Sequence, residues 1–68
     1  MTKMTLKMLR VKEDLNQAQA GKKVGVSADT WGHWERGQTV PDVKRAYDIA
    51  EAFNVHIDDI IFLKNVAV

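Results

Sequence analysis

The chain lacks cysteine altogether, and no apolar stretch in its 68 residues approaches the length of a membrane span. Without cysteine, neither disulfides nor thiolate-bound metals can support the fold, and we expect a reducing, cytoplasmic setting. A membrane span needs about 20 consecutive apolar residues, and no secretion signal opens the chain, so we expect no membrane partner.

The short length limits the expected number of domains to one. We predict a single domain over residues 1–68, with a core in residues 5–62 and a short apolar C-terminal tail in residues 63–68. A chain of this size buries only about 60% of its unfolded surface, so we expect marginal stability unless a partner adds burial.

Apolar spacing and capping residues predict an all-α chain of five short helices, with no strand before the tail. Short polar side chains that accept hydrogen bonds from exposed helix N–H groups are the expected N-caps: Thr5, Asn16, Ser27 and Asp42. Residues that tolerate a left-handed backbone are expected to end three helices: Gly25, Gly37 and Asn54. The expected helices cover residues 6–13, 17–24, 28–36 and 43–53, and a fifth begins at residue 56 or 57 with Ile57, Ile60 and Ile61 facing inward.

The second and third predicted helices are joined by a very short glycine turn. Gly25 ends one helix, and Ser27 caps the next two residues later. Helices joined so tightly cross steeply, so the third helix, residues 28–36, projects from the domain surface. This geometry suits a helix that enters the major groove of DNA.

The charge is unevenly distributed along the chain. Residues 1–40 carry seven basic and four acidic side chains, whereas residues 41–68 carry three basic and five acidic ones. Positive charge therefore collects in the half that contains the projecting helix, as expected of a nucleic-acid-binding surface. An ordinary mixed surface explains the same distribution equally well.

Several motifs in register make residues 5–62 resemble the phage-repressor and Cro-type helix-turn-helix family, the Xre-like regulators. The matching segments are Leu6, Leu9 and Arg10 in the first helix, residues 15–17 (LNQ), residues 22–27 (KKVGVS), residues 34–37 (WERG), Pro41, and residues 49–55 (IAEAFNV). The resemblance implies a compact five-helix bundle of the lambda-repressor type, with the helix-turn-helix formed by the second and third helices.

The resemblance also implies which residues contact double-stranded DNA. Bases are read from the outer side of the third helix, by Ala28, Asp29, Gly32 and His33. Phosphates are contacted by Gln17, Lys22, Lys23, Ser27, Thr30 and Arg36. This set has no bidentate arginine–guanine pair, each of which gives about 1–3 kcal/mol of discrimination, so we expect modest intrinsic specificity.

Seven of these residues also have a purely structural interpretation. In this interpretation Gln17 and Ser27 cap helices, and Asp29 favours the positive end of a helix dipole. The two lysines and His33 fit an ordinary solvated surface. Gly32 costs about 1 kcal/mol relative to alanine in a helix, and is either a tolerated weak point or a place of close approach to DNA.

Two further features are expected to be structural. Trp31 stands where the family usually has isoleucine or valine, and we expect it in the core against the small Ala20 and Gly21. The resemblance implies that Arg10 and Glu35 form a partly buried ion pair between the first and third helices. Removing one partner would then cost several kcal/mol.

The small reading surface favours a homodimer, at least on DNA, bound to a near-palindromic operator. Dimer contacts are expected from the last helix and the tail: Ile61, Phe62, Val66 and Val68. Alternatively, these residues complete the monomer core or are disordered.

We expect no enzyme activity, metal, cofactor or small-molecule ligand, because no nucleophilic, metal-binding or phosphate-loop motif is present. The favoured function is that of a small transcriptional regulator, most simply a repressor from a phage or mobile element. The alternative is an antitoxin-like or antirepressor-like protein-interaction module that uses the same fold.

Overall fold

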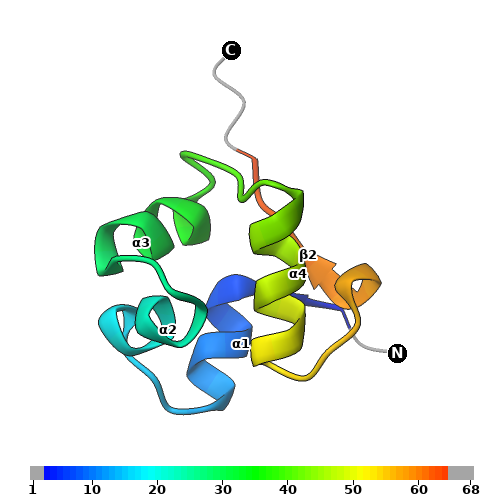
Figure 1. Ribbon diagram of the computed structural model, residues 1–68, viewed down its shortest axis with the longest axis horizontal. Helices are drawn as coiled ribbons and strands as arrows, with labels where there is room; N and C mark the ends of the chain where they lie inside the picture. The colour runs from blue at the N-terminus through cyan, green and yellow to red at the C-terminus, as the bar shows by residue number, and fades with distance from the viewer. Residues whose placement is uncertain (1–2, 65–68) are drawn as a thin grey trace.

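The computed structural model describes residues 3–64, and four α-helices dominate this part of the chain (Figure 1). In chain order the elements are β1 (Met4–Thr5), α1 (Leu6–Lys12), α2 (Gln17–Val24), α3 (Ala28–Arg36), α4 (Val43–Ala52), the 3₁₀ turn η1 (Ile57–Asp59) and β2 (Ile60–Ile61).

All four expected N-caps are present. A side-chain oxygen of the cap accepts a hydrogen bond from the backbone N–H three residues later at Thr5, Asn16, Ser27 and Asp42. Each cap therefore satisfies one of the N–H groups that a helix start leaves without an intrahelical partner. Because these bonds are local, the first residue of each helix could be predicted from the sequence.

The predicted left-handed residues also occur where helices end. Gly25 has φ +82° and Gly37 has φ +74°, and both N–H groups bond back to the preceding helix. Asn54 follows α4 with φ +55°, and Asp14 follows α1 with φ +60°. The left-handed turn at Gly25 directs the chain from α2 into α3.

The prediction of a fifth helix, and of no strand before the tail, is wrong. Only η1 is helical after α4 in the described residues, and the chain then extends into β2. β2 pairs in parallel with β1, with Met4 opposite Ile60 and Thr5 opposite Ile61. The β-branched side chains of Ile60 and Ile61 suit this extended pairing, which overrides the helical spacing of the isoleucines.

The C-terminal isoleucines divide between core and surface. Ile60 is buried, and Ile57 packs against the core from η1, but Ile61 is 38% exposed. The expectation that all three face inward is therefore wrong for Ile61, because neighbouring strand residues point to opposite sides.

The core lies between the four helices and centres on Trp31, which has no exposed surface. Its ring lies 5.7 Å from that of Phe53 and 6.0 Å from that of Trp34, measured between centroids. Ala20, also fully buried, belongs to the same cluster. The prediction that Trp31 is a core residue is confirmed.

Candidate nucleic-acid interface

α2 and α3 lie together on one side of the molecule, with α3 at its edge and α4 on the opposite side (Figure 1). Their close approach depends on Gly21. A Cβ at this position would lie 2.7 Å from the carbonyl oxygen of Val26 and 2.8 Å from that of Ser27. Sequence reasoning paired Gly21 with Trp31 and did not identify this contact between backbones.

α3 has one buried and one exposed face. Trp31 and Trp34 point into the core, whereas Asp29, His33 and Arg36 are exposed. These three exposed residues are spaced by four and then three positions, so they share one face of the helix. We call them the α3 strip. Of the other predicted contacts on α3, Ala28 and Thr30 are half-buried beside the strip.

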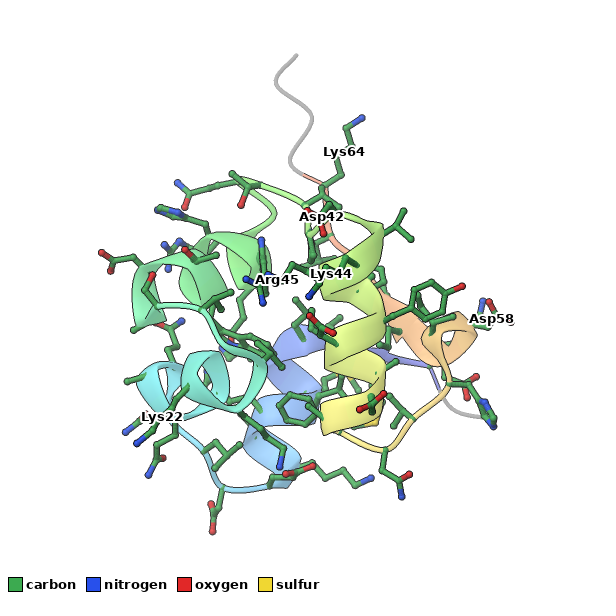
Figure 2. All side chains as sticks on the ribbon, viewed as in Figure 1. Lys22, Asp42, Lys44, Arg45, Asp58 and Lys64 are labelled. Atoms are coloured by element: carbon green, nitrogen blue, oxygen red, sulfur yellow. The ribbon has the colours of Figure 1, made fainter. Side chains whose placement is uncertain are left out.

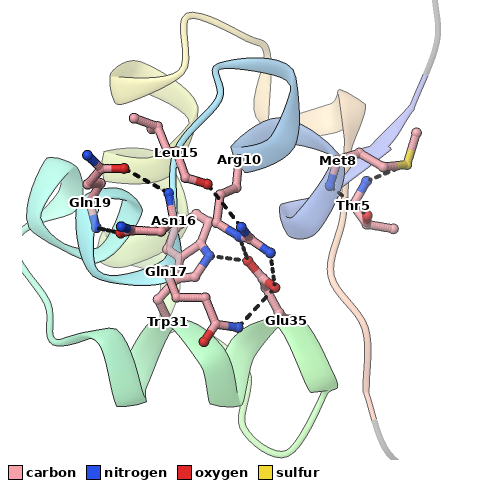
Figure 3. Close-up of polar contacts among 9 residues, drawn as sticks. All are labelled: Thr5, Met8, Arg10, Leu15, Asn16, Gln17, Gln19, Trp31 and Glu35. Carbon is pink, nitrogen blue, oxygen red and sulfur yellow. Dashed lines mark hydrogen bonds and ion pairs between the residues drawn. The ribbon is translucent and has the colours of Figure 1, made fainter.

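Glu35 holds the orientation of α3 by accepting hydrogen bonds from residues of three helices (Figure 3). Arg10 of α1 donates through Nε at 2.5 Å and through Nη2 at 3.2 Å. Gln17 of α2 donates through Nε2 at 3.3 Å, and Trp31 of α3 donates through its indole nitrogen. A third nitrogen of Arg10, Nη1, donates to the carbonyl oxygen of Leu15 at 2.9 Å.

This arrangement contains the Arg10–Glu35 ion pair that the resemblance implied. The two side chains are only 15% and 5% exposed. Burial by itself raises the pKa of Glu35, but the hydrogen bonds from Arg10, Trp31 and Gln17 outweigh it and hold the pKa below its ordinary value. Glu35 is therefore a charged, fully partnered anchor for α3.

Gln17 and Gly32 lie together at the junction of α2 and α3. The side-chain oxygen of Gln17 lies 3.2 Å from the point where a Cβ of Gly32 would stand, and Nη1 of Arg36 lies 3.0 Å from the same point. Gly32 is therefore buried beneath two side chains. Arg36 also donates through Nε to the side-chain oxygen of Gln38 at 3.0 Å.

The two lysines of α2 occupy different surroundings. Lys22 extends from the outer side of α2 (Figure 2) and is exposed. The ammonium of Lys23 lies 3.5 Å from a carboxylate oxygen of Glu13 and 5.6 Å from the ring centroid of Phe53. Glu13 follows α1 and Phe53 follows α4, so Lys23 is directed towards the scaffold rather than towards the α3 strip.

Ser27 and Thr30 form a local pair at the start of α3. The hydroxyl of Ser27 accepts from the backbone N–H of Thr30 and donates to its hydroxyl oxygen, both at 3.1 Å. The Ser27 hydroxyl proton is thus engaged within the cap, while that of Thr30 is available to an outside acceptor.

Arg45 supports the site and was not singled out from the sequence. It extends from α4 towards the helix-turn-helix (Figure 2) and donates through Nη1 to the carbonyl oxygen of Val24 at 3.1 Å. Val24 is the last residue of α2. The carbonyl groups in the last turn of a helix lack intrahelical partners, so this bond satisfies one of them. No local pattern reveals this contact, because it joins residues 21 positions apart.

Of the residues proposed for dimer contacts, Ile61 is exposed and Phe62 is half-buried against the core. Val66 and Val68 lie outside the described residues. Within residues 3–64, no helix has the length and apolarity needed to cross a membrane. The same residues contain no group of three or more His, Asp or Glu side chains placed to hold a metal ion.

Comparison with known proteins agrees with this geometry. A helix-turn-helix family model matches residues 6–60. An uncharacterized HTH-type transcriptional regulator of Archaeoglobus fulgidus is 40% identical over 55 residues, which cover 81% of this chain and 78% of that protein. A regulator of the same description from Methanocaldococcus jannaschii is 38% identical over 60 residues, 88% of this chain and 91% of that protein.

A more distant relative of the same description, from Bacillus subtilis, is 32% identical over 59 residues, 87% of this chain and 89% of that protein. No solved structure matches the chain. The match to the family model and the extent of these similarities show that the chain belongs to the Cro/C1-type helix-turn-helix family.

Proposed function

We propose that this chain is a DNA-binding transcription regulator that places α3 in the major groove of double-stranded DNA. The observation that carries the proposal is the α3 strip. Asp29, His33 and Arg36 face solvent on a helix whose opposite face is fixed by two buried tryptophans. Family membership and relatives named as HTH-type transcriptional regulators support the same role.

Contacts to the DNA backbone give this interface most of its affinity. Gln17 and Arg36 lie at the junction of α2 and α3, where the positive end of the α2 dipole adds to the attraction for phosphate. Lys22, which is exposed near the other end of α2, and Thr30, near the start of α3, add further phosphate contacts. Ser27 serves chiefly as a helix cap. The ammonium of Lys23 is directed towards Glu13, so this lysine adds positive charge to the surface rather than a direct phosphate contact.

Base reading falls to the first turns of α3. Ala28 offers only an apolar contact, which suits a thymine methyl group, and Asp29 accepts from the amino group of cytosine. His33 is long enough to reach a base edge. Gly32 presents no side chain of its own, and Arg36 covers it. Such a weakly donating set gives modest specificity, so we infer that DNA shape contributes to recognition.

We infer that two copies bind a near-palindromic operator and that the bound dimer represses transcription. One recognition helix covers too few base pairs for selective binding, and family geometry places half-sites about one helical turn apart. Ile61, at the end of β2, has an exposed side chain that can contact a second copy. Phe62 contributes partly, since it also packs on the core.

Selection of duplexes from a random pool by the purified protein, with measured stoichiometry, tests this function. Lys22→Glu and Arg36→Glu are expected to weaken binding of the selected duplex and to make its salt dependence less steep. Lys12→Glu is the matched control, because Lys12 lies beside Asn54 and His56, away from α3.

The proposal fails if the protein selects no sequence and the charge reversals on α2 and α3 act no differently from Lys12→Glu. Capture of a stoichiometric protein partner by the wild type, lost in the Arg36→Glu variant, would then favour a protein-interaction module.

A further inference from the structure

Gly32 lies on the exposed side of α3, yet it is buried. The atoms that cover it are the ends of flexible side chains from two helices. A Cβ at this position would lie 3.0 Å from Nη1 and 3.3 Å from Nη2 of Arg36, and 3.2 Å from Oε1 of Gln17. The guanidinium therefore occupies the space that a side chain at position 32 would fill.

Arg36 reaches this place because Gly32 stands one helical turn before it, at a spacing of four residues. Its Nε is held by Gln38. Within residues 3–64, neither terminal nitrogen of Arg36 has a hydrogen-bond partner, so both are free to donate outward. The guanidinium is thus held in a defined place, and the N–H groups of Nη1 and Nη2 are unused.

Gln17 completes the arrangement. Its Nε2 donates one hydrogen bond to Glu35, which fixes the amide beside Gly32, and an amide nitrogen carries a second N–H. A guanidinium and an amide side by side, both held in place, match the several acceptor oxygens of one phosphate.

We propose that Gly32 is a positioning residue for Arg36. Its missing side chain lets the guanidinium lie against the α3 backbone beside Gln17, where the two side chains together bind one phosphate of the DNA backbone. The inference rests on the proposed function and adds Gly32 to it, as a residue that affects DNA binding through Arg36.

Two other roles for Gly32 give different results. If its backbone approaches DNA directly, any side chain at position 32 weakens binding whether or not Arg36 is present. If it is only a tolerated weak point in the helix, alanine strengthens the helix and leaves DNA affinity unchanged.

A double-mutant cycle distinguishes these roles. Affinity for the selected duplex is measured at several salt concentrations for the wild type, Gly32→Ala, Arg36→Met and the double variant, and thermal unfolding is recorded for each. We expect Gly32→Ala to bind about tenfold more weakly, as for loss of a charged hydrogen bond. Its salt slope is expected to become less negative by about 0.9, which corresponds to one phosphate.

Its melting temperature is expected to equal or exceed that of the wild type, since only flexible side-chain ends must move. In the Arg36→Met background, Gly32→Ala is expected to have no further effect on affinity. Unchanged affinity of Gly32→Ala, or an equal loss in both backgrounds, overturns the positioning role.

A second measurement needs no variant at Gly32. Single phosphates of the selected duplex are replaced by neutral methylphosphonate. We expect one position at which neutralisation weakens the wild type, and at which it weakens both Arg36→Met and Gln17→Ala by a smaller factor. Different positions for the two variants overturn the shared phosphate site.

The failure of this inference and the failure of the proposed function are distinguishable. A wild type that selects no duplex defeats both. A wild type that binds with a steep salt slope, and whose Gly32→Ala variant behaves identically, defeats the positioning role alone.

Discussion

Arg10 and Glu35 are 25 residues apart in the chain, and Nε of Arg10 lies 2.5 Å from a carboxylate oxygen of Glu35. The contact joins α1 to the end of α3, and hydrogen bonds from Gln17 and Trp31 meet at the same carboxylate. Glu35, which fixes the orientation of α3, therefore has a nearly buried side chain. Folding and presentation of the α3 strip depend on the same buried charge.

Arg10→Met is expected to destabilise the protein by about 3 kcal/mol, because it leaves the nearly buried Glu35 carboxylate without its cationic partner. Urea unfolding followed by tryptophan fluorescence measures the loss. Lys44→Met is the matched control. Its ion pair with Asp48 is exposed, so its removal is expected to cost less than about 1 kcal/mol. Equal losses in the two variants would contradict a special role for the buried pair.

Acidification is expected to lower the free energy of unfolding, partly because the Glu35 carboxylate becomes protonated. Because the pKa of Glu35 is held below its ordinary value of 4.5, the charged carboxylate stabilises the fold fully above that value. This contribution is lost as the pH falls through the lowered pKa.

The check is the free energy of unfolding of the wild type and of Glu35→Gln between about pH 7 and about pH 3. Glu35→Gln is expected to be less stable near neutral pH, and the gap is expected to narrow in acid. A gap that stays constant over this range would mean that Glu35 titrates alike in the folded and unfolded states.

Gly21→Ala is expected to destabilise the fold by about 1–3 kcal/mol, because the new methyl group would press on two backbone carbonyl oxygens of the turn. Gly32→Ala is the matched substitution in the neighbouring helix. It meets only flexible side chains, and is expected to leave stability unchanged or raise it by up to about 1 kcal/mol. Thermal unfolding of both variants tests this contrast, and a reversed order would show that the α2–α3 approach is looser than described.

The parts of the fold that follow from local chemistry could be predicted from the sequence. Ser27 and Asp42 open helices by bonding a backbone N–H three residues on, and Gly37 ends one in the left-handed conformation. Each of these features depends only on residues within about one helical turn of it. The end of the chain could not be predicted in this way, because Ile60 pairs with Met4, more than fifty residues earlier.

The same division applies to the candidate site. The spacing of Asp29, His33 and Arg36 along one helix is enough to place them on a common face. The contacts that hold this face in place join separate elements, as when Arg45 bonds the carbonyl of Val24. Such contacts depend on the angle and distance between helices, which no local pattern contains. The covering of Gly32 by Arg36 and Gln17 belongs to this second kind.

Trp31→Phe is expected to cost about 1–3 kcal/mol more than Trp34→Phe, because only the indole of Trp31 donates a hydrogen bond to the Glu35 carboxylate. Both tryptophans are nearly or fully buried, and each substitution keeps an aromatic ring while removing similar volume. The difference between the two variants therefore isolates the bond to Glu35. Urea unfolding monitored by circular dichroism avoids reliance on the tryptophan that each variant loses. Equal costs for the two substitutions would show that volume, rather than this hydrogen bond, decides the contribution of Trp31.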